Sequence, residues 1–191
     1  MHPLSKKNVK LLLDTISNTT YARVRDYTIA ITILDCGIRI GELLQTKIDD
    51  INFKEHYLIV RGSVSKTRTE RILPLSNHTL KFLEQLCDIS IGENRDEVFL
   101  STTGLCAVPE QTIQLNFRRY KLDAGITVKC TPYVLRHTFA TEMVKKGMDI
   151  FTLQKIMGHT NITTTRQYVQ IDDTTMMKKH RESSPLDAYL K

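Results

Sequence analysis

The sequence predicts an α+β fold that is mainly α-helical and carries a small antiparallel β-sheet. Most of the chain places apolar residues at helical spacing, whereas residues 57–62 (YLIVRG) and 69–75 (TERILPL) have the composition of β-strands. A polar, basic turn joins these two runs, which is typical of a β-hairpin with Lys66 near its tip. The 191 residues contain no repeat and no Pro/Gly-rich linker. We therefore expect one domain over residues 1–171, followed by a polar tail over residues 172–191.

Capping residues mark the helices that precede the hairpin. Leu4 and Val9 flank Ser5 as a hydrophobic staple around an N-cap, which predicts a helix beginning there. Gly37 follows the next apolar run and favours a break in the helix. The helices expected in this part of the chain are 5–16, 21–34 and 42–44, with a break at 35–37.

Helical periodicity returns after Pro74. Thr131 can cap a helix whose first turn suits Pro132, and Gly158 can end the helix that follows it. The expected helices are 77–87, 109–124, 131–146 and 150–157, and a small strand is expected at 98–100.

Charge and cysteine content narrow the class of protein. The net charge of +6 and a pI near 9.1 favour an acidic partner, of which nucleic acid is the commonest. Hydrophobic residues make up 41% of the chain, so it is not a disordered tail. The four cysteines lack metal-ligand spacing, and no apolar run is long enough to cross a bilayer. We expect a cytoplasmic protein with reduced thiols and no membrane segment or structural zinc.

One face of the helix that begins at Thr131 carries several polar side chains, although the helix is otherwise built of apolar residues. Tyr133, Arg136 and His137 fall together at i, i+3 and i+4. Taken alone, such residues are more often solvated or paired with a carboxylate than functional.

Other candidate residues also have simple structural interpretations when taken singly. Arg39 and Glu42 can form an ion pair, and a tyrosine such as Tyr168 usually packs half-buried. Lys66, Arg68 and Arg71 can be a charged sheet edge that prevents association.

The combination of these groups suits a phosphodiester. Guanidinium groups bind non-bridging oxygens and neutralise charge in the transition state, while an ammonium or imidazole can protonate a departing oxygen. No carboxylate cluster suited to magnesium is evident, which favours covalent attack by tyrosine without a metal or other cofactor. The groups concerned are Arg39, Lys66, Arg136, His159 and Tyr168.

Four segments resemble, in order, the motif regions of the tyrosine recombinase family. This family comprises integrases of phages and conjugative transposons and the enzymes that resolve chromosome dimers. The resemblance runs from about Leu4 to Val169 and implies the catalytic-domain fold of that family. The segments are CGIRIGELL (36–44), SKTRTERILPL (65–75), TPYVLRHTFAT (131–141) and MGHTNITTTRQYV (157–169).

The resemblance implies a role for each matching residue. Arg39 and Arg136 would clamp the scissile phosphate, and Tyr168 would be the nucleophile. Lys66 would be the general acid for the 5′-hydroxyl leaving group, and His159 would hydrogen-bond a phosphate oxygen. The supporting roles are orientation of neighbouring side chains for Glu42, a buried structural part for His137, and DNA binding for Arg68 and Arg71, either of which could replace Lys66 if the hairpin register differs.

Tyr133 departs from the family pattern, in which His is usual at this position of a His-x-x-Arg motif. A phenol can donate a hydrogen bond to phosphate, but its pKa near 10 makes it a poor acid-base substitute for imidazole. We therefore expect Tyr133 to belong to the site and the chemistry to be slower.

The resemblance predicts a site-specific DNA recombinase that cleaves and rejoins strands of double-stranded DNA through a 3′-phosphotyrosyl intermediate. It implies a homotetramer on two recombination sites, with the tail, including PLDAYL (185–190), packing on a neighbouring protomer or folding back. The family's usual N-terminal DNA-clamping domain has no counterpart here, so DNA binding should be weak and salt-sensitive. Two alternatives remain: a type IB topoisomerase-like nicking-closing enzyme and a non-catalytic DNA-binding accessory protein.

Overall fold

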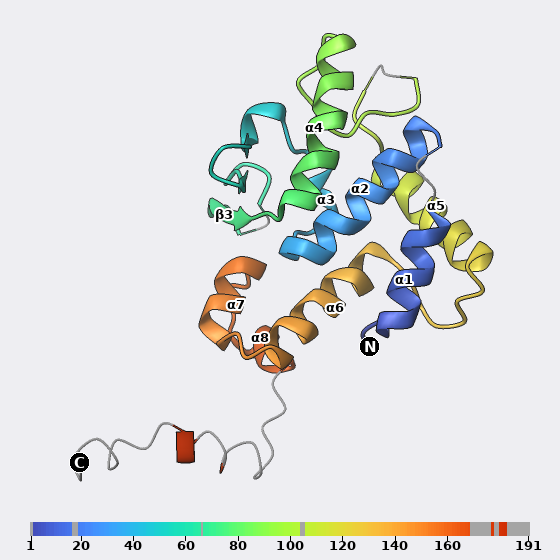
Figure 1. Ribbon diagram of the computed structural model, residues 1–191. Coiled ribbons are helices and arrows are strands. Elements are labelled where there is room, and N and C mark those ends of the chain that lie inside the picture. The colour runs from blue at the N-terminus through green and yellow to red at the C-terminus, as the bar shows by residue number, and fades with distance from the viewer. Residues whose placement is uncertain are drawn as a thin grey trace.

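The computed structural model describes residues 2–16, 19–65, 67–103, 106–168, 177 and 180–182. This part of the chain is mainly helical with a small antiparallel sheet, as expected, and the sheet has three strands (Figure 1). The elements in order are α1 (Lys6–Thr15), α2 (Tyr21–Cys36), α3 (Ile40–Leu43), the 3-10 helix η1 (Ile48–Asp50), β1 (Ile51–Asn52), β2 (Tyr57–Val60), β3 (Arg71–Pro74), α4 (Asn77–Gly92), α5 (Glu110–Asp123), α6 (Pro132–Lys145), α7 (Ile150–Met157) and α8 (Thr163–Arg166).

Helix α2 is the central element of the core. It contacts both α4 and α6 and lies between them (Figure 1). Ile29, Ala30 and Ile33 are fully buried, and burying each isoleucine contributes roughly 1.5–3 kcal/mol. The hydroxyls of Thr28 and Thr32, also buried, are satisfied by carbonyls one turn earlier in the helix. The packing of α2 against its neighbours therefore fixes the position of its C-terminal end, where the next segment begins.

The small sheet has the strand order β1-β2-β3, and one of its arginine side chains lies on the buried face. Leu58 pairs with Leu73, and Val60 pairs with Arg71. Because side chains alternate along a strand, Arg71 shares the buried face with Leu73, whereas Ile72 between them is 59% exposed. The arginine therefore points toward α7, which packs against β3.

Helices α6 and α7 begin and end where the capping residues predict. The Thr131 hydroxyl accepts from the Val134 amide, and Pro132 occupies the first turn of α6. Gly158 ends α7 in the left-handed conformation, with φ at 60°. A small apolar cluster of Phe139, Ala140, Leu153 and Met157 joins the two helices.

Several predicted boundaries require correction. The expected strand at 98–100 is wrong: Leu100 forms an isolated bridge with Ala107, and the run is apolar because it enters the core. Strand β1 was not expected, and α4 continues to Gly92 rather than ending at 87. Lys66 lies outside the described residues, as does PLDAYL in the tail, so the domain boundary at 171 stays a prediction.

Candidate active site

Three consecutive carbonyl groups at the end of α7 each accept a hydrogen bond from a different arginine. The last carbonyls of a helix have no partner within it and carry partial negative charge, so cations are stabilised there. The arginines come from segments distant in sequence, which the end of α7 therefore brings together. The bonds run from Arg71 Nε to Ile156 O (3.0 Å), from Arg136 Nη2 to Met157 O (2.6 Å) and from Arg39 Nη2 to Gly158 O (2.8 Å).

Glu42 connects two of these arginines. Its Oε1 lies 2.9 Å from Arg39 Nη1, and its Oε2 lies 2.5 Å from Arg71 Nη2. The carboxylate is 4% exposed, and burial alone would raise its pKa. The hydrogen bonds and charges of Arg71 and Arg39 outweigh burial, so the pKa of Glu42 is lowered. Glu42 is therefore ionised at neutral pH and holds both guanidinium groups in place.

Arg136 is the most deeply placed member of the site. It is 6% exposed, and its Nη1 donates to the carbonyl of Gly37 at the end of α2. Burial, followed by the charge of Arg39, lowers the pKa of Arg136 to about 9, so it remains charged at neutral pH. Gly37 has φ at 65°, and a Cβ there would lie 2.3 Å from the Phe139 ring. Only glycine lets this carbonyl reach the arginine without displacing that ring.

His159 lies against Arg136. Its Nε2 is 3.2 Å from Arg136 Nη2, and its Nδ1 is 2.9 Å from the hydroxyl of Thr165. Burial and then the charges of Arg136, Arg39 and Arg71 lower the pKa of His159 to about 4. The imidazole is therefore neutral at physiological pH.

Tyr168 follows α8 and is partly buried beside this group. Its ring centroid lies 5.1 Å from that of His137, and its side chain packs on the cluster between α6 and α7. Burial raises the pKa of the Tyr168 phenol, Tyr133 raises it further, and Arg136 opposes the rise. Tyr133 itself is 59% exposed, in the first turn of α6. The phenol of Tyr168 is thus protonated at neutral pH.

The structure gathers most of the residues singled out from the sequence, but Arg71 departs from its expected surface position. Arg68 is exposed in the hairpin connection, whereas Arg71 is 7% exposed and paired with Glu42. Both terminal nitrogens of Arg71 donate to the Glu42 carboxylate, so its charge is already paired and it fits the framework of the site instead. The inward position of Arg71 in the alternation of TERILPL could have indicated this. Thr165 and the carbonyls of α7 were not foreseen, because contacts of this kind leave no motif.

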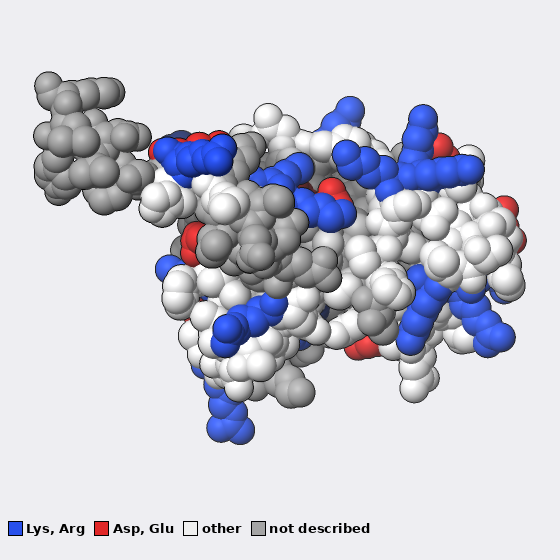
Figure 2. Space-filling model, turned by 90° about the horizontal axis from the view of Figure 1, so that it is seen from below, with Lys and Arg blue, Asp and Glu red and all other residues white. Residues whose placement is uncertain are grey.

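Basic side chains are prominent on the lower face of the molecule, which Figure 2 shows. Figure 2 shows more Lys and Arg surface than Asp and Glu surface there, in keeping with the net charge of +6. Within the described ranges, no three or more His, Cys, Asp or Glu residues form a group that could hold a metal ion. No helix in the described part of the chain is both long and apolar enough to cross a bilayer.

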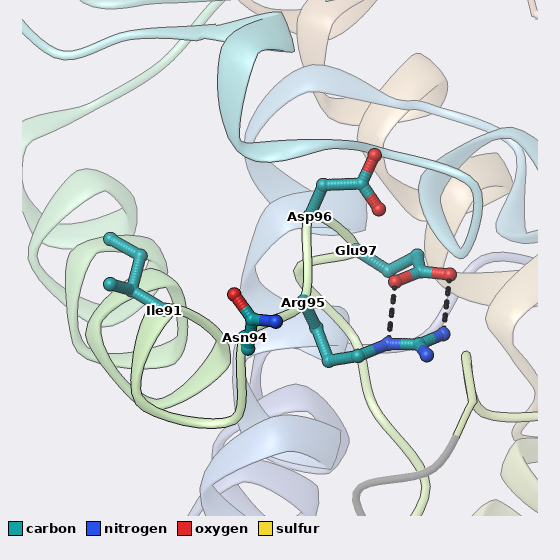
Figure 3. A pocket seen from close by; sticks show the side chains of 5 residues that line it. All are labelled: Ile91, Asn94, Arg95, Asp96 and Glu97. Carbon is teal, nitrogen blue, oxygen red and sulfur yellow. Dashed lines mark hydrogen bonds and ion pairs between the residues drawn. The ribbon is translucent and has the colours of Figure 1, made fainter.

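A separate open hollow of about 520 Å³ lies at the end of α4 (Figure 3). Arg95 pairs with Glu97 at 2.9 Å, and Asp96 pairs with Lys47 at 2.6 Å. These charges tie the end of α4 to the segment before η1. The hollow therefore has a structural explanation, and we place no function there.

Comparisons with known proteins agree with this arrangement. The model of the phage integrase family matches residues 3–175. Tyrosine recombinase XerC of Chlamydia caviae is 27% identical over 187 residues, which are 96% of this chain and 59% of that protein. The chain thus spans less than two thirds of the length of this curated relative.

Solved structures share the fold. The crystal structure of XerA recombinase matches with a TM-score of 0.77 and 31% identity, covering 97% of this chain and 66% of that one. The Tn1549 transposon integrase, solved in complex with circular intermediate DNA, matches with a TM-score of 0.79 over 95% of this chain and 66% of the other. Its identity of 22% supports a common fold alone. From the family match over 3–175 and these relatives, the chain belongs to the phage integrase family, in the group of tyrosine recombinase catalytic domains.

Proposed function

We propose that this chain is the catalytic part of a site-specific DNA recombinase or integrase, which breaks and rejoins strands through a tyrosine-linked intermediate. The observation that carries the proposal is the contact of Arg136 with His159 at 3.2 Å, beside Arg39 and within electrostatic reach of Tyr168. This set brings an anion clamp and a nucleophile to one place.

The charge of the site suits a phosphodiester. Three guanidinium groups and one carboxylate leave a net charge of +2, since His159 is neutral. We assign Arg39 and Arg136 to the non-bridging oxygens, where they neutralise the charge that builds as phosphorus becomes five-coordinate. Glu42 and Arg71 hold these groups from behind. Arg71 is thereby assigned to positioning in place of DNA contact.

In the proposed step, Tyr168 Oη attacks phosphorus and forms a phosphotyrosine bond while the bond to the 5′-oxygen breaks. The phenol loses its proton to solvent, and the departing oxygen takes one from Lys66, a role that the family resemblance implies. Rejoining reverses the step when a 5′-hydroxyl from another duplex attacks the phosphotyrosine. The bond energy is conserved, so the proposal requires neither a metal nor a nucleotide.

The proposed substrate is double-stranded DNA, and the proposed assembly is a homotetramer on two recombination sites, with Arg68 on the hairpin contacting DNA. The exposed position of Arg68 and the DNA complex of the Tn1549 integrase support the choice of substrate. Free cysteines, three of them buried, fit the cytoplasm as the place of action.

Tyr133 favours one alternative, a DNA-binding accessory protein without catalysis. A phenol in place of imidazole weakens proton transfer at the site. Such a protein would bind DNA and never become linked to it. A type IB topoisomerase-like enzyme would form the linkage on one duplex and would not exchange strands between two.

The test uses a nicked suicide DNA duplex taken from the DNA that flanks the gene. The protein, Tyr168→Phe and Tyr133→Phe are incubated with it at low salt, and products are separated on a denaturing gel. We expect a slowly migrating adduct that disappears in Tyr168→Phe and persists in Tyr133→Phe. Binding in a shift assay without any adduct would overturn the catalytic proposal in favour of the accessory protein.

A further inference from the structure

We propose that Thr165 is a positioning residue that stabilises each tautomer of His159 in turn, accepting a hydrogen bond from it in the free site and donating one to it when phosphate is bound. The inference deepens the proposed function and rests on it for the role of His159 at the phosphate.

The hydrogen bonds of the free site determine where the imidazole proton lies. A guanidinium has donors and no acceptor, so the contact of 3.2 Å between Arg136 Nη2 and His159 Nε2 requires a lone pair on Nε2. A neutral imidazole then carries its proton on Nδ1, which lies 2.9 Å from Thr165 Oγ1. Thr165 is therefore the acceptor in this state.

A bound phosphate reverses the requirement at Nε2. Phosphate oxygens accept hydrogen bonds, so His159 can bind one while neutral only if its proton lies on Nε2. One proton then leaves Nδ1 and another is taken up at Nε2, through water, with no change in net charge. Nδ1 now needs a donor, and the Thr165 hydroxyl can rotate to supply it. A backbone carbonyl or an apolar side chain could not serve both states.

The position of Thr165 also connects the imidazole to the nucleophile. Thr165 is fully buried in α8, and its carbonyl accepts from the backbone amide of Tyr168 at 3.1 Å. The side chain of one residue thus orients His159 while its main chain fixes the segment that leads to Tyr168. A displacement of His159 would therefore shift the segment that leads to Tyr168, and a displacement of that segment would shift His159.

The test measures the tautomer by ¹⁵N NMR of the histidine rings in the full chain, with His159→Gln to assign the signal. We compare Thr165→Val, which removes the hydroxyl, with Thr165→Ser, which keeps it. Thr164→Val is the matched control, because Thr164 is exposed in the same helix. We expect the Nδ1–H form in the protein, Thr165→Ser and Thr164→Val, and a smaller fraction of it in Thr165→Val, where the Nδ1 proton has no acceptor.

Saturating inorganic phosphate is expected to move the proton to Nε2 in the protein and in Thr165→Ser. In the suicide-substrate assay, adduct formation should fall about 10- to 100-fold in Thr165→Val and recover in Thr165→Ser. An Nε2–H form in the free protein, an unchanged tautomer in Thr165→Val, or an Nδ1–H form that persists with phosphate would overturn the inference. A correct tautomer pattern without any adduct would instead count against the proposed function.

Discussion

The substitution Glu42→Gln removes one buried negative charge and should strongly destabilise the protein, although the side chain keeps its size. The carboxylate is 4% exposed and contacts Arg39 and Arg71 at 2.9 and 2.5 Å. In Glu42→Gln an amide group replaces one oxygen and turns its own N–H donors toward guanidinium donors. Breaking a buried ion pair in this way typically costs about 3–5 kcal/mol. At the lower end of that range, the melting temperature should fall by roughly 6–12 °C for a chain of this size.

The assay is urea unfolding at neutral pH, with Glu142→Gln as the matched control. Glu142 pairs with Lys145 at 2.9 Å, but this pair is far more exposed, so its loss should cost under about 0.5 kcal/mol. The lowered pKa of Glu42 adds a second check. Its stabilisation is fully present above pH 4.5, the ordinary pKa of a glutamate side chain, and is lost as pH falls through the lower pKa of the folded state. A difference below about 1 kcal/mol at neutral pH, or one that does not shrink in acid, would refute the reasoning.

Three further predictions concern other parts of the site. The pKa of His159 falls from 6.5 to about 4, so stability should be complete above pH 6.5 and decline toward pH 4. Urea titrations of His159→Gln should show a shallower decline, by roughly 1–2 kcal/mol after allowance for partial exposure. Gly37→Ala places a Cβ 2.3 Å from the Phe139 ring and should lower the free energy of unfolding by about 2–4 kcal/mol. Gly147 also has positive φ but has open space around it, so Gly147→Ala should lower the free energy of unfolding by about 1 kcal/mol. Equal shifts of the melting temperature in the two variants would contradict this. Tyr133→His should raise the rate of adduct formation at least about tenfold, and an unchanged rate would show that no acid-base group is needed there.

Local sequence signals predicted much of the fold. Helix α7 occupies the expected 150–157, because Asp149 caps it and Gly158 ends it. The hairpin was predicted from two β-type runs and a polar turn. The strand expected at 98–100 was wrong, because an apolar run indicates burial without specifying whether a neighbouring strand pairs with it.

The candidate site was predictable as a set of residues and not as an arrangement. Arg39, Arg136, His159 and Tyr168 were singled out by their chemistry and order, and the structure brings them together. The partners of each depend on contacts between distant segments, such as Arg136 with the carbonyl of Gly37, and no local pattern encodes these. Arg71 shows the difference most clearly, because a basic residue on a hairpin is expected at the surface until the register of β3 is known.

The convergence of three arginines on the end of α7 means that the candidate site forms only after this helix has been synthesised. The carbonyls that hold them, at positions 156–158, leave the ribosome after all three arginines, and Tyr168 leaves later still. A nascent chain, or one in which α7 has unfolded locally, has the arginines without the frame that aligns them. Under the proposed chemistry, an incomplete molecule lacks the aligned arginines and the tyrosine that cutting DNA requires.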